Sequence, residues 1–90
     1  MLTLYSKTIC GFCVQAKSLL KSYSIPFEEI NIEDNENLRS YLKNKGLRTV
    51  PQFFIQDEHV FNGFTDLSSH SREEILAKIG EYDANKSRVG

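Results

Sequence analysis

The sequence has only two cysteines, two prolines and no tryptophan, and it lacks both a basic excess and a long apolar run. Its 11 Lys and Arg residues face 12 Asp and Glu residues, for a net charge of −1, so the charge pattern does not favour a nucleic-acid partner. No apolar run approaches the roughly 18 residues of a membrane-spanning helix. Residues 1–6 carry neither the charged nor the long apolar region of a secretion signal. These absences predict a soluble, cytoplasmic protein with no nucleic-acid or membrane partner.

The two cysteines, Cys10 and Cys13, are separated by two residues. A zinc site would need two more ligands, and the only histidines, His59 and His70, are eleven residues apart, which does not match a zinc finger. A structural disulfide across so short a loop would constrain the unfolded chain little. Two inert core cysteines would not explain why the pair lies where a strand pattern gives way to a helical one. In a reducing cytosol, such a pair indicates redox chemistry and no metal.

The position of Cys10 predicts its chemistry. Residues 1–6 alternate between apolar and polar, and residues 11–23 are amphipathic with helical spacing. A strand that runs into a helix would put Cys10 at the helix N-terminus and Cys13 one turn later, within reach of a disulfide. Unpaired N–H groups and the helix dipole favour a thiolate there. We therefore expect a lowered pKa for Cys10, the nucleophile, with Cys13 as the resolving thiol.

Apolar periodicity divides the rest of the chain into strands and helices. Further strands are expected at residues 27–32, 53–55 and 59–61, a second helix from a cap at Asp34 or Asn35 to residue 45, and a C-terminal helix with a capping box of Ser71 and Glu74. The order β-α-β-α-β-β-α predicts an α/β fold, in which a four-stranded mixed sheet has helices on both faces. Ninety residues make one domain, 1–82, followed by a polar, frayed tail, 83–90.

Three motifs resemble the glutaredoxins, a branch of the thioredoxin superfamily. They are Leu4-Tyr5-Ser6-Lys7 leading to Cys10-Gly11-Phe12-Cys13, then Thr49-Val50-Pro51, and then Gly63-Phe64-Thr65-Asp66-Leu67. The similarity covers nearly the whole chain in the right order and spacing. It implies a thioredoxin-like (glutaredoxin) fold of the dithiol type, with Pro51 in the cis form facing the two cysteines.

The resemblance also implies a glutathione site. Its residues would be Lys7, Phe12, Thr49, Val50, Pro51, Thr65 and Asp66. A lysine ahead of the cysteines and the start of the last helix would hold the carboxylates, and the backbone at Val50 would bind the peptide like an added strand. Separately, the same residues fit structural roles: Thr49-Val50-Pro51 as the start of a strand, Thr65 and Asp66 as caps, and Phe12 as core. Their joint order favours the site.

The chain departs from the family pattern at three points. Gly11-Phe12 replaces the common Pro-Tyr between the cysteines and is typical of the monothiol class, which has serine in place of Cys13. Asn62 replaces the first of two glycines that often precede the last helix. Leu38 stands where many members have a polar residue that holds the glycine carboxylate of glutathione, and the candidates to substitute for it are Arg39 and Arg48.

Three functions follow from this resemblance. The leading hypothesis is a monomeric, glutathione-dependent thiol-disulfide oxidoreductase that reduces glutathione mixed disulfides and protein disulfides through Cys10 and Cys13. The missing proline after Cys10 motivates a second hypothesis, in which two chains share an iron-sulfur cluster through Cys10 and two glutathiones. The third is a small redoxin that a flavoprotein reductase reduces and that serves an enzyme such as ribonucleotide reductase.

Overall fold

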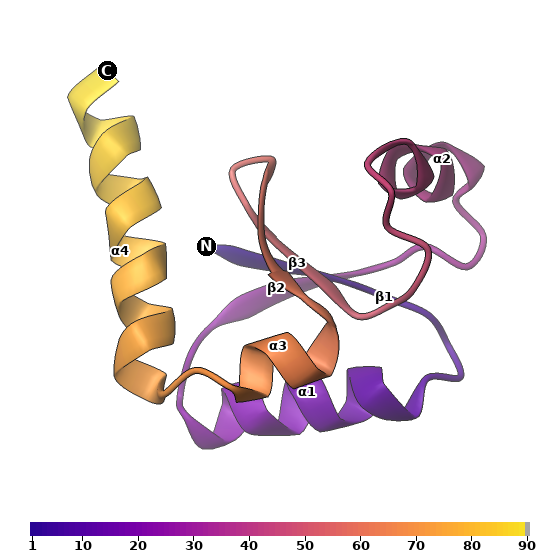
Figure 1. The fold of residues 1–90 in the computed structure, drawn as a ribbon, viewed down its shortest axis with the longest axis horizontal. Coiled ribbons are helices and arrows are strands. Elements are labelled where there is room, and N and C mark those ends of the chain that lie inside the picture. Colours follow the sequence, from indigo (N-terminus) through magenta and orange to yellow (C-terminus); the bar gives the residue numbers. More distant parts are fainter. Residues whose placement is uncertain (90) are drawn as a thin grey trace.

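The computed structural model describes the backbone of residues 1–89 and the side chains of residues 1–82. Within this part, the strands are β1 (Leu2–Ser6), β2 (Phe27–Asn31), β3 (Gln52–Ile55) and β4 (Glu58–Asn62). The helices are α1 (Gly11–Ser22), α2 (Glu36–Asn44), α3 (Gly63–Ser68) and α4 (Arg72–Val89). Figure 1 shows α2 and α4 at opposite ends of the molecule. No described helix is both long enough and apolar enough to span a membrane.

The strands form one mixed sheet in the order β2-β1-β3-β4. β1 pairs with β2 in parallel, as the crossover through α1 predicts, and with β3 in antiparallel orientation. β3 and β4 form a hairpin whose turn residues, Gln56 and Asp57, both have positive φ, at 51° and 68°. Such dihedrals are typical of a tight two-residue hairpin turn. The predicted mixed four-stranded sheet is confirmed.

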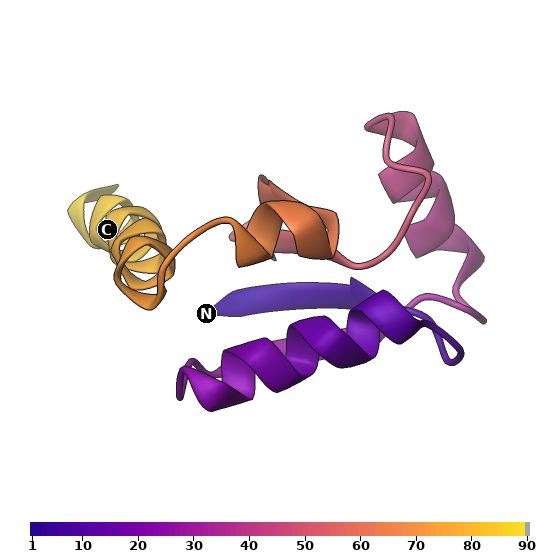
Figure 2. The same ribbon diagram turned by 60° about the horizontal axis from the view of Figure 1, so that its bottom comes forward.

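Each face of the sheet is covered by helices. One buried cluster joins Leu4 and Phe53 of the sheet to Leu20 of α1, Leu67 of α3 and Ile75 of α4. Figure 2 shows α1 lying along β1 on this face. A second cluster, on the other face, joins the sheet residues Tyr5 and Phe54 to Leu42 of α2. β3 lies between β1 and β4 and is buried along its whole length, as is typical of a short, wholly apolar run such as residues 53–55.

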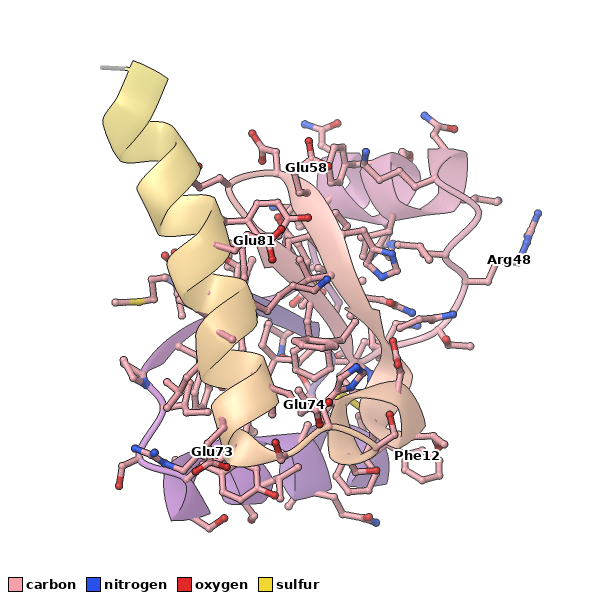
Figure 3. The ribbon with its side chains drawn as sticks, turned by 60° about the vertical axis from the view of Figure 1, so that its left-hand side comes forward. Phe12, Arg48, Glu58, Glu73, Glu74 and Glu81 are labelled. Carbon is pink, nitrogen blue, oxygen red and sulfur yellow. A yellow bond between two sulfur atoms is a disulfide. The ribbon has the colours of Figure 1, made fainter. Side chains whose placement is uncertain are left out.

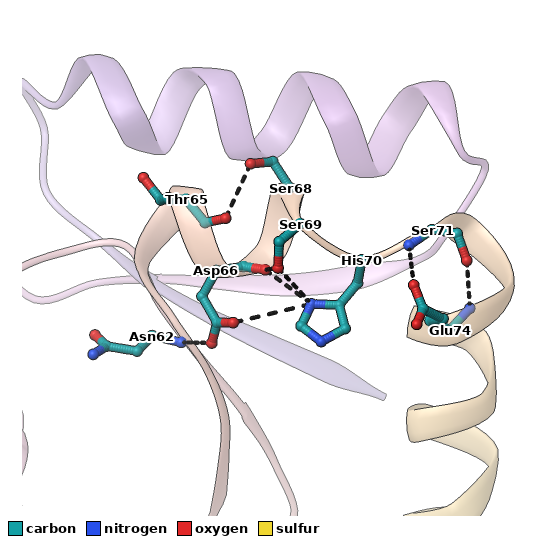
Figure 4. A network of polar contacts seen from close by, with 8 residues as sticks. All are labelled: Asn62, Thr65, Asp66, Ser68, Ser69, His70, Ser71 and Glu74. Carbon is teal, nitrogen blue, oxygen red and sulfur yellow. Dashed lines mark hydrogen bonds and ion pairs between the residues drawn. The ribbon is translucent and has the colours of Figure 1, made fainter.

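The last helical segment differs from the prediction. Instead of one helix it contains the short helix α3 and then α4, so the order is β-α-β-α-β-β-α-α. The predicted capping box at the start of α4 is confirmed, because Ser71 N–H donates to the Glu74 carboxylate at 2.7 Å and Glu74 N–H donates to Ser71 Oγ at 3.1 Å (Figure 4). α4 extends past Tyr82 to Val89. The side chains of residues 83–90 lie outside the described part, so the frayed tail stays a prediction.

The start of α3 also needs a correction. Thr65 and Asp66 do not cap this helix from outside, because α3 begins at Gly63 and Asn62 occupies the N-cap position. Gly63 has a φ of +80°, a conformation that glycine adopts without a steric penalty. The Asp66 carboxylate accepts the Asn62 N–H at 2.8 Å from within the helix. Asp66 therefore closes the first turn of α3 and satisfies a backbone donor that the helix leaves unpaired.

Candidate active site

Cys10 occupies the N-cap of α1, at the point where the chain leaves β1 and turns into the helix. Its backbone is extended, with φ −155° and ψ 103°, and its Sγ accepts the Cys13 N–H at 3.1 Å. The two cysteines form a disulfide, with 5.2 Å between their Cα atoms. Strand, loop and helix therefore place the pair as its spacing predicts. A sulfur at this position receives a backbone donor and the positive end of the helix dipole.

The two sulfurs differ in their access to solvent. Cys13 is buried, with 1% of its surface exposed, whereas Cys10 is partly exposed. An incoming disulfide can therefore reach Cys10 and not Cys13. This asymmetry agrees with the predicted roles of nucleophile and resolving thiol.

Two large apolar side chains close to Cys10 in the sequence are exposed. Phe12, between the cysteines, is 59% exposed and stacks on Phe64 of α3 with ring centroids 6.3 Å apart. Figure 3 shows Phe12 at the surface, which rules out a purely core role. Ile9, directly before Cys10, is 93% exposed. Ile9 and Phe12 therefore present apolar surface to a substrate that approaches Cys10.

The loop before β3 faces the disulfide. The Val50-Pro51 peptide bond is cis, as the resemblance implied, and the Val50 carbonyl oxygen lies 3.8 Å from Cys10 Sγ. Val50 precedes the strand pairing, which begins at Gln52. A peptide at the sulfur would therefore meet the Val50 backbone at the end of the sheet.

A cavity of about 370 Å³ opens beside this loop. Lys7, Thr49 and Val50 line it, and the Val50 carbonyl oxygen lies 3.8 Å from Cys10 Sγ. Its lining also includes three more cations and one acid, from Arg39, Lys43, Arg48 and Glu36. The lining thus has an excess of positive charge, although the chain as a whole has a net charge of −1. A groove of one charge sign raises the local concentration of ligands of the opposite sign.

The cationic side chains that line the cavity differ in whether hydrogen bonds hold them in place. The Arg39 guanidinium donates to the carbonyl oxygens of Ile32 and Glu33, at the end of β2. Arg48 extends from its loop into solvent (Figure 3). Within the described side chains, Arg48, Lys7 and Lys43 form no ion pair. Of the two arginines predicted to substitute at Leu38, Arg48 is therefore the one free to move onto a ligand.

Thr65 and Asp66 do not line this cavity. They lie in α3, which packs against α1 and carries a polar network (Figure 4). His70 Nδ1 lies 2.8 Å from the Asp66 carbonyl oxygen and 4.0 Å from its carboxylate. The His70 ring also packs on Phe61, with centroids 4.9 Å apart. The first turn of α3 is therefore held by several polar contacts and lies outside the lining of the cationic cavity.

Two polar clusters on the sheet were not predicted from the sequence. In the first, Ser6 Oγ donates to the Glu29 carboxylate at 2.7 Å, and Lys17 Nζ lies 3.1 Å from the same oxygen. The Ser6 hydrogen bond lowers the pKa of Glu29, and Lys17 adds to this effect against the opposing effect of burial. The Glu29 side chain is partly exposed, and its carboxylate joins α1 to the sheet.

The second cluster is built on Gln52, which is fully buried. Its amide contacts Thr49, Asn62 and His59. Burial lowers the pKa of His59, against an opposing backbone hydrogen bond at Phe61. The one sequence signal for this cluster is a polar residue directly before the apolar run 53–55.

The site has a redox-active pair at a helix N-terminus, one sulfur accessible and one buried, opposite a cis-proline loop. Such a pair exchanges disulfides with an incoming thiol or disulfide through the exposed sulfur. Together with the mixed sheet and its flanking helices, these features define a thiol-disulfide oxidoreductase of the thioredoxin-like fold.

Residues 2–60 match the glutaredoxin family model, and the chain belongs to the glutaredoxin family. Glutaredoxin 3 of Escherichia coli (strain K12) is 40% identical over 65 residues, which are 71% of this chain and 77% of that protein. Glutaredoxin 1 of Rickettsia prowazekii is 35% identical over 82 residues, which are 88% of this chain and 85% of that protein.

Solved structures of plant glutaredoxins have the same fold. The holo form of glutaredoxin C1 from Populus tremula x tremuloides matches with a TM-score of 0.75 at 27% identity, over 92% of this chain and 78% of that one. A buckwheat glutaredoxin-glutathione complex matches with a TM-score of 0.71 at 26% identity, over 89% and 76%. Both agree with the architecture described above.

Proposed function

We propose that this protein is a glutathione-dependent oxidoreductase that reduces glutathione mixed disulfides and protein disulfides. The observation that carries the proposal is the placement of Cys10 Sγ. It caps α1 and lies 3.8 Å from the carbonyl oxygen of Val50, a residue that lines the cavity with excess positive charge. Glutathione offers a sulfur, a peptide backbone and two carboxylates, which match these three features in turn.

Reduction of a glutathione mixed disulfide uses Cys10 alone. Its thiolate attacks the glutathione sulfur of the substrate, the substrate disulfide breaks, and the substrate leaves as a thiolate that takes a proton from water. Cys10 is then bonded to glutathione. A second glutathione thiolate attacks the sulfur of the bound glutathione, which releases oxidised glutathione and regenerates the Cys10 thiolate.

Reduction of a protein disulfide uses both cysteines. The Cys10 thiolate attacks one sulfur of the client disulfide, which breaks that bond, forms a mixed disulfide and frees the other client sulfur as a thiolate that takes a proton from water. The buried Cys13 thiol then loses its proton and attacks Cys10, which releases the client as a dithiol and leaves the Cys10–Cys13 disulfide seen in the structure. Two molecules of glutathione reduce that bond in turn.

The charges around the site support this choice of reductant. Lys7 and Arg48 carry free positive charge in the cavity, where the glycine carboxylate would lie. Leu38 packs against the buried cluster under α2 and offers no polar group. In this proposal, Arg48 binds the glycine carboxylate in its place. Thr65 and Asp66, in the first turn of α3, would meet the other end of the tripeptide near its amine and carboxylate. The buckwheat relative is described as a complex with glutathione.

Two cysteine variants test the mechanism. We expect Cys10→Ser to abolish all activity, whereas Cys13→Ser retains reduction of a glutathionylated peptide and loses reduction of protein disulfides. Both reactions are followed by NADPH consumption with glutathione and glutathione reductase. An equal loss of both reactions in both variants would contradict this division of roles.

The same assay distinguishes the proposed function from the third hypothesis, a small redoxin. A small redoxin would draw electrons from a flavoprotein thioredoxin reductase in place of glutathione and its reductase. The free cations of the cavity favour glutathione. Turnover with the flavoprotein alone, and none with glutathione, would refute the proposed reductant.

The cluster hypothesis is motivated by the missing proline after Cys10. A Cβ added at Gly11 would meet nothing within 4 Å, so packing does not require glycine at this position. Anaerobic reconstitution with iron and sulfide in the presence of glutathione tests it. A colourless monomer after this treatment would dispose of the cluster, and a coloured dimer would establish it as a second function.

A further inference from the structure

Gln52 has no role in the chemistry proposed above, yet it is fully buried beside the site. It is the first residue of β3 and directly follows Pro51. The rest of this strand is Phe and Ile. A polar amide is stable in such surroundings only when its donors and its acceptor find partners.

The Gln52 amide has a partner for each of its polar atoms. Its Nε2 donates to the Thr49 carbonyl oxygen at 3.1 Å and to Asn62 Oδ1 at 2.8 Å. Its Oε1 lies 2.8 Å from His59 Nε2, so the ring carries its proton on that nitrogen. The His59 ring packs in turn on Phe54, with centroids 5.0 Å apart. The side chain is held from three directions.

The partners of Gln52 belong to two separate parts of the site. Thr49 lines the cationic cavity and precedes Val50, the residue that faces Cys10. Asn62 ends β4, and its N–H donates to the Asp66 carboxylate in the first turn of α3. A single buried amide thus connects the segment that would hold the peptide backbone to the helix that would hold one end of the tripeptide.

We propose that Gln52 is a positioning residue for glutathione, which sets the distance between the 49–51 segment and the start of α3. The inference rests on the proposed function. Gln52 acts through Thr49 and Asn62 and contacts neither sulfur. Its loss should therefore weaken glutathione binding while Cys10 keeps its intrinsic reactivity, a split that a general loss of stability would not produce.

Two variants and one control test this role. Gln52→Glu keeps the shape of the side chain but turns its donor into an acceptor that faces two acceptors. Gln52→Met keeps the length and removes all hydrogen bonds. Gln56→Glu, in the exposed turn at the other end of β3, adds the same charge away from the site. Calorimetry measures the Kd for S-methylglutathione, which cannot exchange, and iodoacetamide alkylation measures Cys10 reactivity.

We expect both Gln52 variants to raise the Kd about tenfold, equivalent to about 1.4 kcal/mol, with an unchanged alkylation rate and with Gln56→Glu identical to the wild type. Wild-type affinity in both folded variants overturns the inference and leaves the proposed function intact. Absence of binding by the wild type overturns the proposed function itself.

A third variant keeps the test decisive if the Gln52 variants fail to fold. Asn62 is exposed, so Asn62→Ala removes one acceptor of the connection from its solvent side. We expect this variant to weaken binding about fivefold, the effect of one hydrogen bond of ordinary strength. Wild-type affinity in Asn62→Ala would overturn the inference.

Discussion

Removal of the Glu29 carboxylate tests how α1, which carries the cysteines, is held on the sheet. Ser6 is fully buried, and its hydroxyl donates to Glu29 at 2.7 Å. Lys17 of α1 approaches the same oxygen at 3.1 Å. Glu29→Ala would leave the Ser6 hydroxyl with no acceptor and Lys17 with no ion-pair partner.

The magnitude follows from these two contacts. A buried polar group without its partner costs about 1–3 kcal/mol. The side chains of Lys17 and Glu29 are 30% and 35% exposed, so solvent screens their ion pair, and it adds only about 0.2–1 kcal/mol. We therefore expect Glu29→Ala to lower the free energy of unfolding by roughly 2 kcal/mol. In a domain of this size that loss corresponds to a fall in Tm of roughly 10 °C. Glu29→Gln retains an acceptor for Ser6 and should lose less.

The stabilisation by the Glu29 carboxylate should depend on pH. The Ser6 hydrogen bond, with help from Lys17, lowers the pKa of Glu29 in the folded protein. The stabilisation is therefore complete above the unfolded pKa, near 4.3, and is lost as the pH falls through the folded pKa. Urea unfolding should show a gap between the wild type and Glu29→Gln at neutral pH that closes in acid. Glu28→Ala, at the exposed neighbouring position on β2, is the control. Equal stability of the Glu28→Ala and Glu29→Ala variants would refute the reasoning.

Two further predictions concern the C-terminal helix and the cationic cavity. Ser71→Ala removes half of the capping box and should lower the free energy of unfolding by about 1 kcal/mol, measured by urea titration; no change would show that the box does not hold α4. Lys7→Gln should raise the KM for a glutathionylated peptide several-fold, and added salt should shrink this difference because it screens the lysine. The control Lys78→Gln, on α4, should leave the KM unchanged, and an equal effect of both variants would contradict a specific role for Lys7.

The position of the cysteines was predictable because two periodicities meet at one point. Alternation ends at Ser6 and helical spacing begins at Gly11, which leaves Cys10 at the helix N-terminus in any fold that keeps both elements. The hairpin and the buried central strand follow equally from local patterns. These features depend only on residues close together in the sequence.

The features that were missed depend on residues far apart in the sequence. The break between α3 and α4 contains neither glycine nor proline, and its one local sign is the capping box of Ser71 and Glu74, which marks where α4 begins but not where α3 ends. The connection from Gln52 to Asn62 exists only because β3 and β4 pair. Likewise, the Glu29 carboxylate reaches Ser6 only through the parallel pairing of β1 and β2. A single polar residue next to an apolar run does not reveal which distant group will satisfy it.

The most direct test of the account measures how the Cys10 thiol titrates. In the reduced Cys13→Ser variant, Cys10 is the one remaining cysteine, so the rate of iodoacetamide alkylation against pH reports its thiolate alone. A sulfur that caps α1 and receives a backbone N–H should reach its full reaction rate at a clearly lower pH than free cysteine, which titrates at about pH 8.5. A profile that coincides with that of free cysteine would contradict the claim that the helix N-terminus activates this sulfur.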